Sequence, residues 1–257
     1  MYMKKAISSL LTWGLVWVLA GCGTHYRLVG EERTRILIDS RYDAAPDVQA
    51  TAFLAPYRQK VDSVMGPVVG KVAHDMAAHR PESDLSNLLP DILVYMSKYY
   101  GERPDFGVYN VGGIRAALSK GDVTYGDVLD VAPFENKICF LTLTGENVLE
   151  LFSQICRRGG EGVSEGVGIV MAKDGRLLSA TLHGKPVNPE STYRVVTIDY
   201  LAQGNDGLEA FKNGTNLVSP QEEKYNSRYV IADYFREMMK EGIVVDSKVE
   251  GRIVIED

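Results

Sequence analysis

The sequence contains few of the side chains from which hydrolytic centres are usually built. It has four histidines and three cysteines in 257 residues. His74 and His79 are five positions apart, so they do not follow the i, i+4 spacing of metal ligands on a helix. No cysteine pair has zinc-like spacing, and we find no nucleophile elbow, Walker-type phosphate loop or dinucleotide fingerprint. The sequence therefore identifies no hydrolytic centre, which leaves a site assembled from distant residues as the alternative.

The chain also lacks an excess of positive charge. Its 28 Lys and Arg residues are outnumbered by 34 Asp and Glu residues, which gives a formal net charge of −6. Binding to a nucleic acid polymer needs clustered basic residues, so we do not expect such a partner. A small phosphorylated ligand is compatible with this charge, because a few local arginines are enough to hold it. Cys139 and Cys156 lie in apolar patterns and are predicted to be buried thiols.

The N-terminus has the order of features found in secretory signals. Lys4 and Lys5 precede an almost wholly apolar run over residues 6–19, which is short for a membrane span of about 20 residues. The sequence Leu-Ala-Gly-Cys at residues 19–22 resembles a bacterial lipobox. By that resemblance, residues 1–22 are a lipoprotein signal peptide and Cys22 carries the lipid, with an uncleaved anchor helix as the alternative. Residues 23–34 would be a tether, and residues 35–257 a body in the cell envelope, held at the outer membrane and facing the periplasm.

Residues 35–257 mix helical and strand patterns without a strict βαβ rhythm, which predicts a single α+β domain. We expect Pro90 to interrupt the second helix. Residues 168–197 are predicted to form a small antiparallel meander, and residues 203–227 to be loops. The expected helices cover residues 47–65, 85–96, 145–155 and 230–238, and the expected strands cover residues 35–39, 67–72, 106–109, 137–144, 193–197 and 252–256.

Residues 110–115 have the sequence Asn-Val-Gly-Gly-Ile-Arg, directly after a predicted strand. Gly112 and Gly113 let the backbone turn sharply and approach a ligand closely. Asn110 supplies an amide before the turn, and Arg115 a planar set of donors after it. Taken alone, the segment is also compatible with an ordinary strand-to-helix turn.

Two further segments carry side chains suited to ligand recognition. Pro133 presents Phe134 in a loop, where an aromatic ring is either part of the core or a stacking platform. Residues 197–207 contain Tyr200 and then Asp206, beside glycines that free the backbone. A carboxylate that accepts two hydrogen bonds suits a vicinal diol such as a ribose, and a solvated Asp-Gly turn is the alternative.

Together these segments resemble the C-terminal domain of the 5′-nucleotidase family. The family pattern has Asn-x-Gly-Gly-Ile-Arg, Gly-Asp-[Ile/Val]-Thr-Tyr, Pro-Phe, Leu-Thr-Gly and Asp-[Phe/Tyr]-Leu-Ala-x-Gly-Gly-Asp-Gly in that order. The resemblance covers most of residues 45–257, and Asn205 departs from it by replacing a glycine. The corresponding segments here are residues 110–115, 121–125, 133–134, 143–145 and 199–207, together with Glu-Ser-Asp-Leu-Ser-Asn-Leu at residues 82–88.

The resemblance implies a role for each matching residue. Phe134 and Tyr200 would sandwich a nucleobase, and Asp206 would hold ribose hydroxyls. Asn110 and Arg115 would contact base, ribose or phosphate, with Gly112 and Gly113 allowing the turn between them. A further arginine of the family lies just before the Glu-Ser segment, and Arg80 is the residue here that could match it.

The resemblance also implies a division of labour. Family members carry a two-metal phosphoesterase domain upstream of this one, whereas the predicted export segment occupies that place here. We therefore expect no cofactor in this chain, and divalent metals only in a separate metallophosphoesterase that receives the nucleotide. The alternatives are a non-catalytic lipoprotein that binds nucleosides or nucleotides, and a domain whose pocket has lost its ligand.

Overall fold

The computed structural model describes residues 27–256, so the predicted signal peptide and Cys22 lie outside the described residues. Among the described residues, the chain divides into two units between Thr51 and Ala52. The predicted strand at residues 35–39 is wrong, because these residues are exposed and have no neighbouring strand to pair with. The predicted domain start at residue 35 stays a prediction.

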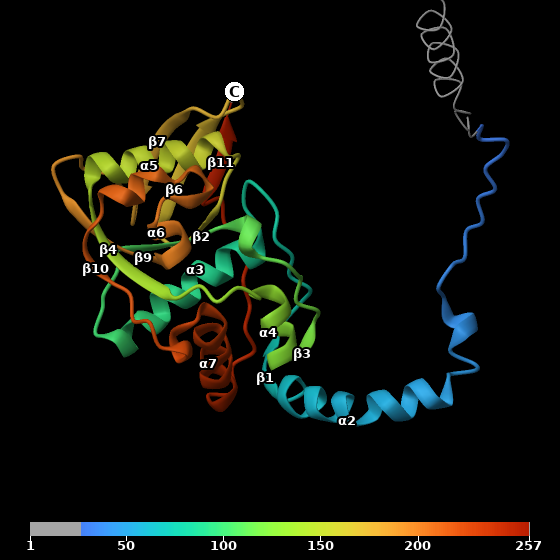
Figure 1. The fold of residues 1–257 in the computed structure, drawn as a ribbon. Coiled ribbons are helices and arrows are strands. Elements are labelled where there is room, and N and C mark those ends of the chain that lie inside the picture. Colours follow the sequence, from blue (N-terminus) through green and yellow to red (C-terminus); the bar gives the residue numbers. More distant parts are fainter. Residues whose placement is uncertain (1–26, 257) are drawn as a thin grey trace, which may run out of the picture. The chain divides into compact units, whose positions relative to one another are not determined.

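The central sheet of the second unit is mixed, which confirms the α+β prediction (Figure 1). β2 (Phe106–Tyr109) and β9 (Thr192–Ile198) run parallel, whereas β4 (Ile138–Thr144) pairs antiparallel with β9 on its other side. The predicted loop region 203–227 contributes an exposed edge strand to this sheet, so the loop prediction is wrong there. In spatial order the strands are β10 (Thr215–Val218), β4 (Ile138–Thr144), β9 (Thr192–Ile198), β2 (Phe106–Tyr109) and β5 (Gly162–Val163).

The other strands of residues 27–256 form two smaller sheets. The predicted meander is confirmed for β6, β7 and β8 but not for residues 193–197, which leave it and enter the central sheet as part of β9. β11 pairs parallel with β6, and β1 pairs antiparallel with β3. The strands are β1 (Val68–Val72), β3 (Gly121–Thr124), β6 (Val167–Ala172), β7 (Leu177–Leu182), β8 (Lys185–Pro186) and β11 (Ile253–Glu256).

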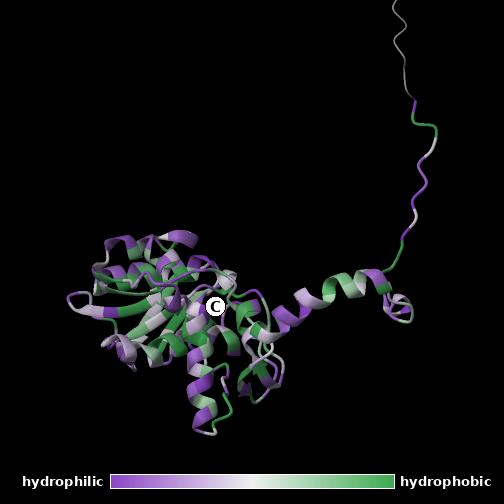
Figure 2. Ribbon diagram, turned by 60° about the horizontal axis from the view of Figure 1, so that its bottom comes forward, coloured by the Kyte–Doolittle hydropathy of each residue, from purple (hydrophilic) through white to green (hydrophobic). Residues whose placement is uncertain are grey.

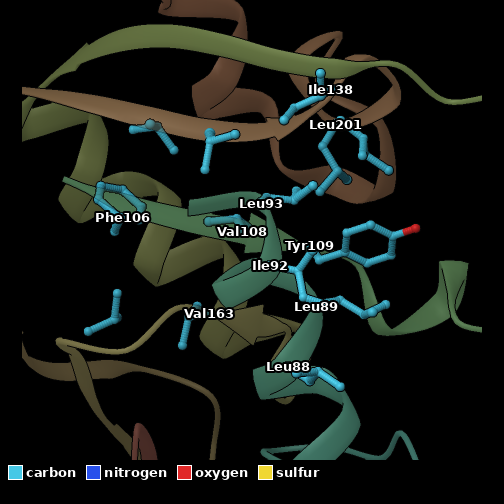
Figure 3. Packing of buried hydrophobic residues seen from close by; sticks show 14 of the residues in the cluster. Leu88, Leu89, Ile92, Leu93, Phe106, Val108, Tyr109, Ile138, Val163 and Leu201 are labelled. Atoms are coloured by element: carbon cyan, nitrogen blue, oxygen red, sulfur yellow. The ribbon is translucent and has the colours of Figure 1, made fainter. Parts of the chain in front are cut away.

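Helix α3 (Asp84–Met96) supplies one side of the core beneath β2. Figure 3 shows Ile92 and Leu93 beside Val108, and all three are buried. Ser83 caps the helix by accepting a hydrogen bond from the backbone N–H of Ser86. Pro90 lies inside the helix without interrupting it, contrary to the prediction. Burial of most of the helix surface offsets the cost of an interior proline, which is about 3 kcal/mol.

Besides α3, the α-helices of the described residues are α2 (Val48–Met65), α4 (Tyr125–Val131), α5 (Gly145–Arg157), α6 (Asp199–Ala202) and α7 (Ser227–Lys240). Helix α2 has no buried residue. Helices α4, α5, α6 and α7 contact the strands of the sheets, and hydrophobic residues concentrate in the interior of the second unit (Figure 2). Cys139 and Cys156 are free and buried, as predicted, and burial raises the pKa of both thiols to about 11. No helix within residues 27–256 has the length and apolar character needed to cross a bilayer.

Candidate functional site

The strand directions place the predicted site segments at one edge of the central sheet. In the parallel pair, Phe106 of β2 lies opposite Val195 of β9, so the residues that follow these strands emerge on the same side. β4 runs the other way and begins there, with Ile138 opposite Ile198. The edge therefore gathers the turn that starts at Asn110, the loop that precedes β4, and the segment that follows β9.

Asp206 accepts hydrogen bonds from two other predicted site residues. The Nδ2 of Asn110 donates a hydrogen bond to Oδ2 of Asp206 over 2.7 Å, and the hydroxyl of Tyr200 donates to Oδ1 over 3.1 Å. The hydrogen bond to Asp206 is the largest cause of a raised pKa at Tyr200. Asp206 has a φ of 56° and is flanked by Gly207 with a φ of 70°, so this tight left-handed turn presents the carboxylate. The structure brings Asn110, Tyr200 and Asp206 together.

The two predicted stacking residues lie on segments that share one anchor. Phe134 is 48% exposed and Tyr200 is 36% exposed, so both rings offer surface to a ligand. The carboxylate of Asp199 accepts hydrogen bonds from the backbone N–H of Lys137 over 3.0 Å and of Tyr200 over 2.8 Å. Asp199 therefore fixes the end of the Phe134 loop against the start of the Tyr200 helix.

The glycine turn has one constrained glycine and one free glycine. Residues Val111–Gly113 form a single 3-10 turn after β2. A Cβ atom at Gly113 would lie 2.5 Å from Oδ1 of Asn110, whereas a Cβ at Gly112 would meet nothing within 4 Å. Arg115 is exposed, and its guanidinium donates to the carbonyl of Gly112 over 3.2 Å. Gly113 is thus required for the position of Asn110, while Arg115 remains outside the Asp206 cluster.

Arg80 is linked to the glycine turn at residues 111–113 through the buried carboxylate of Glu161, which sequence reasoning did not predict. Its Nη2 donates to Oε1 of Glu161 over 2.5 Å, and its Nε donates to the carbonyl of Gly160 over 2.7 Å. The other carboxylate oxygen of Glu161 accepts from the backbone N–H of Val111 over 2.6 Å. The side chain of Glu161 is fully buried, so it links Arg80 firmly to the residue that follows Asn110.

Arg158 connects the buried carboxylate to the predicted ribose-binding aspartate. Its Nε donates to Glu161 over 2.6 Å, and its Nη2 lies 3.8 Å from Oδ2 of Asp206. The side chain is 30% exposed, which leaves part of the guanidinium accessible. Arg158 lies just after α5 in the sequence Arg-Arg-Gly-Gly-Glu, which has the composition of an ordinary charged turn and carries no distinctive signal. Sequence reasoning therefore missed both Arg158 and Glu161.

The charges of this site suit an anionic or polyhydroxylated ligand. Arg80, Arg115 and Arg158 supply positive charge, and the carboxylates of Glu161, Asp199 and Asp206 supply negative charge. Within residues 27–256, no three His, Cys, Asp or Glu side chains are arranged to hold a metal ion. The described residues at this edge can accept hydroxyl groups, pair with an anion and stack on a planar ring.

A cavity of about 780 Å³ lies elsewhere in the compact unit. It is lined by residues that include Asp91, His183 and Arg252, and by none of the predicted site residues. Arg252 is buried there, and its guanidinium is already paired with Asp91 over 2.8 Å and with Glu250 over 2.8 Å. This cavity and the predicted site residues therefore lie in different parts of the second unit.

Comparisons with known proteins match this part of the chain to one family. Residues 68–213 match the model of the 5′-nucleotidase, C-terminal domain. Silent protein UshA(0) of Salmonella typhimurium is 25% identical over 208 residues, which are 80% of this chain and 36% of that protein. The trifunctional nucleotide phosphoesterase protein YfkN of Bacillus subtilis is 29% identical over 241 residues, which are 84% of this chain and 16% of that protein.

A solved structure has the same fold over most of the chain. The crystal structure of a 5′-nucleotidase precursor from Thermus thermophilus superposes with a TM-score of 0.70 at 28% identity. The match covers 84% of this chain and 45% of that protein. The chain spans about a third of the length of the UshA proteins that it matches. The similarity thus concerns one domain of longer relatives.

Proposed function

The chain belongs to the family of 5′-nucleotidase C-terminal domains, and on this premise we propose that it recognises a nucleotide or nucleoside at the Asp206 edge of the central sheet. The observation that carries the proposal is the meeting of Asn110 and Tyr200 on the carboxylate of Asp206. Amide, aromatic ring and carboxylate supply contacts for a base and a ribose within a few ångströms of one another. The ligand is a small molecule, and a nucleic acid polymer is not the expected partner.

Each residue has a distinct part in this recognition. Phe134 and Tyr200 stack on the two faces of the base, and such stacking contributes roughly 1–3 kcal/mol per base. Asp206 accepts hydrogen bonds from the ribose hydroxyls, and Asn110 holds the carboxylate from the protein side. The arginines at the edge pair with phosphate when the ligand carries it.

The chemical step is proposed to belong to a second protein. A phosphoester hydrolase of this kind uses divalent metals, and we place these in a separate metallophosphoesterase that receives the bound nucleotide. Both proteins would work in the cell envelope, with this chain held through lipid on Cys22 at the outer membrane and facing the periplasm. The alternative is a lipoprotein that captures nucleosides or nucleotides without any catalytic partner.

Reconstitution tests the division of labour. Phosphate release from AMP is measured for an exported metallophosphoesterase from the same cells, with its metal, before and after addition of this protein. The split enzyme predicts a gain in rate that Phe134→Ala reduces, because the variant loses one stacking face. Equal rates with and without this protein contradict the split enzyme. Binding of adenosine or AMP in that case leaves the non-catalytic lipoprotein as the function.

A further inference from the structure

Arg228 on helix α7 is a buried arginine that contacts both neighbours of Phe134 in the chain. Its Nη1 donates a hydrogen bond to the carbonyl of Pro133 over 3.1 Å. Its Nη2 donates to the carboxylate of Glu135 over 3.0 Å. The side chain of Arg228 is 10% exposed, whereas Phe134 between the two contacts is 48% exposed. One buried group thus binds the backbone carbonyl before an exposed ring and the side-chain carboxylate after it.

Core packing does not account for a charge at this position. Burial of a guanidinium is costly unless the group is well paired. Glu135, the carboxylate that contacts Arg228, is 75% exposed, so the ion pair is screened by water and contributes little to stability. The Nε of Arg228 is buried and has no hydrogen-bond partner among the described residues. The guanidinium also lies over the ring of Tyr229, 5.6 Å from its centroid, while both of its hydrogen bonds are made to the one loop that carries Phe134.

The first turn of α7 reinforces the same loop. The backbone N–H of Ser227 donates to the carbonyl of Asn136 over 2.7 Å, and Lys137 contacts the side chain of Asn226. The backbone from residue 133 to residue 137 is consequently fixed to one helix end, while the ring of Phe134 stays accessible. A ring whose backbone is already in place loses less conformational freedom on binding, so less of the binding free energy is spent on ordering it.

We propose that Arg228 is a positioning residue that holds Phe134 ready to stack on a planar base. This inference rests on the proposed function, because it takes Phe134 to be a stacking residue. Arg228 itself does not touch the ligand. Its effect passes through the Pro133 carbonyl and the Glu135 carboxylate to the backbone of the intervening residue.

A double-mutant cycle with adenosine as the probe tests this proposal by calorimetry. Arg228→Gln is expected to weaken adenosine binding about tenfold, which corresponds to the upper part of the cost of ordering one side chain on binding. The same substitution in a Phe134→Leu background is expected to change the affinity less than about twofold, because the ring that it positions is gone. Equal losses in both backgrounds, or no loss in either, would overturn the proposal.

Two companion variants control for a general structural effect. Arg236→Gln lies on the same helix and removes an exposed ion pair with Asp233, so it should leave adenosine affinity unchanged. Glu135→Gln removes one charged partner of Arg228 at the surface, where the fold tolerates it, and should weaken binding about two- to threefold. An unchanged affinity for Glu135→Gln, or a matching loss for Arg236→Gln, would count against the proposal.

Hydrogen exchange separates failure of this inference from failure of the proposed function. Arg228→Gln should speed exchange of the amides at residues 134–137, and Arg236→Gln should not. If wild-type protein binds neither adenosine nor AMP but shows this local change, the proposed function fails while the positioning contact stands. If adenosine binds and neither affinity nor exchange responds to Arg228→Gln, only the role of Arg228 is lost.

Discussion

The side chain of Asn110 donates a hydrogen bond to Asp206 over 2.7 Å, although the two residues are 96 positions apart in the sequence. The bond joins the turn after β2 to the turn after β9, the two segments that bring most of the predicted ligand contacts. Asn110 binds Oδ2 of the carboxylate and Tyr200 binds Oδ1, so each oxygen is held by one side chain. Disturbing Asn110 should therefore disturb recognition even where the ligand is not touched directly.

Gly113 and Gly112 provide a matched test of this bond. Gly113→Ala places a Cβ 2.5 Å from Oδ1 of Asn110, so the Asn110 amide that binds Asp206 must shift. We expect a stability loss of about 1–3 kcal/mol and weaker adenosine binding. Gly112→Ala meets nothing within 4 Å and should change the free energy of unfolding by less than about 0.5 kcal/mol. Urea unfolding and calorimetry of the pair check this, and equal effects of the two substitutions would refute it.

Tyr200 separates the contribution of its ring from that of its hydroxyl. Tyr200→Phe keeps the stacking face and removes the 3.1 Å hydrogen bond to Asp206, so adenosine affinity should change less than about threefold. Tyr200→Ala removes the ring and should weaken binding roughly 5- to 150-fold. Titrations of both variants with adenosine give the comparison. A loss of similar size in both variants would assign the effect to the hydroxyl instead of the ring.

Arg158 and Arg157 are adjacent arginines with different surroundings. Arg158 links Glu161 to Asp206, whereas Arg157 pairs with Glu150 over 2.7 Å on the surface of α5. Arg158→Gln should weaken AMP binding about tenfold through lost support of Asp206 and lost positive charge. Arg157→Gln should change it less than about twofold. The prediction fails if the two variants bind AMP with equal affinity.

The raised pKa of His74 predicts that the stability of the fold depends on pH. Its hydrogen bond to the backbone of Asp75 is the largest cause that raises its pKa above 6.5, and the carboxylates of Asp246 and Asp84 act in the same direction. Because the folded-state pKa is raised, the stabilisation is complete below about pH 6.5 and is lost as the pH rises through the raised value. The difference in Tm between wild type and His74→Gln should therefore be larger at about pH 6 than at about pH 8. A difference that grows with pH contradicts this sign.

Local patterns were enough to predict much of the fold. The strand at Phe106–Tyr109 and the helix at Gly145–Arg157 follow from apolar periodicity and a turn signal, because their own residues form their buried faces. β10 was missed because its residues are exposed and pair only with β4, as the outermost strand of the sheet. They therefore carry no apolar pattern. The apolar run at residues 35–39 gave a false strand, since a strand also needs a partner that the run itself does not encode.

The site was predictable where it lies in short motifs and not where it depends on distant contacts. Asn110, Tyr200 and Asp206 stand in recognisable segments, and the structure brings them together. Glu161 is 81 positions from Arg80 and 50 from Val111, so its contacts with both leave no local signature. Arg158 likewise depends on the packing of α5 against the sheet. The roles of the predicted residues in ligand binding stay predictions.

The central claim is that this sheet edge binds a nucleoside or nucleotide between Phe134 and Tyr200. The most direct test is a calorimetric titration of wild-type protein and Phe134→Ala with adenosine, AMP and inorganic phosphate. The account predicts binding of adenosine or AMP by wild type, and a roughly 5- to 150-fold weaker affinity in the variant. Failure of wild-type protein to bind either ligand, or equal affinity in the variant, would contradict it.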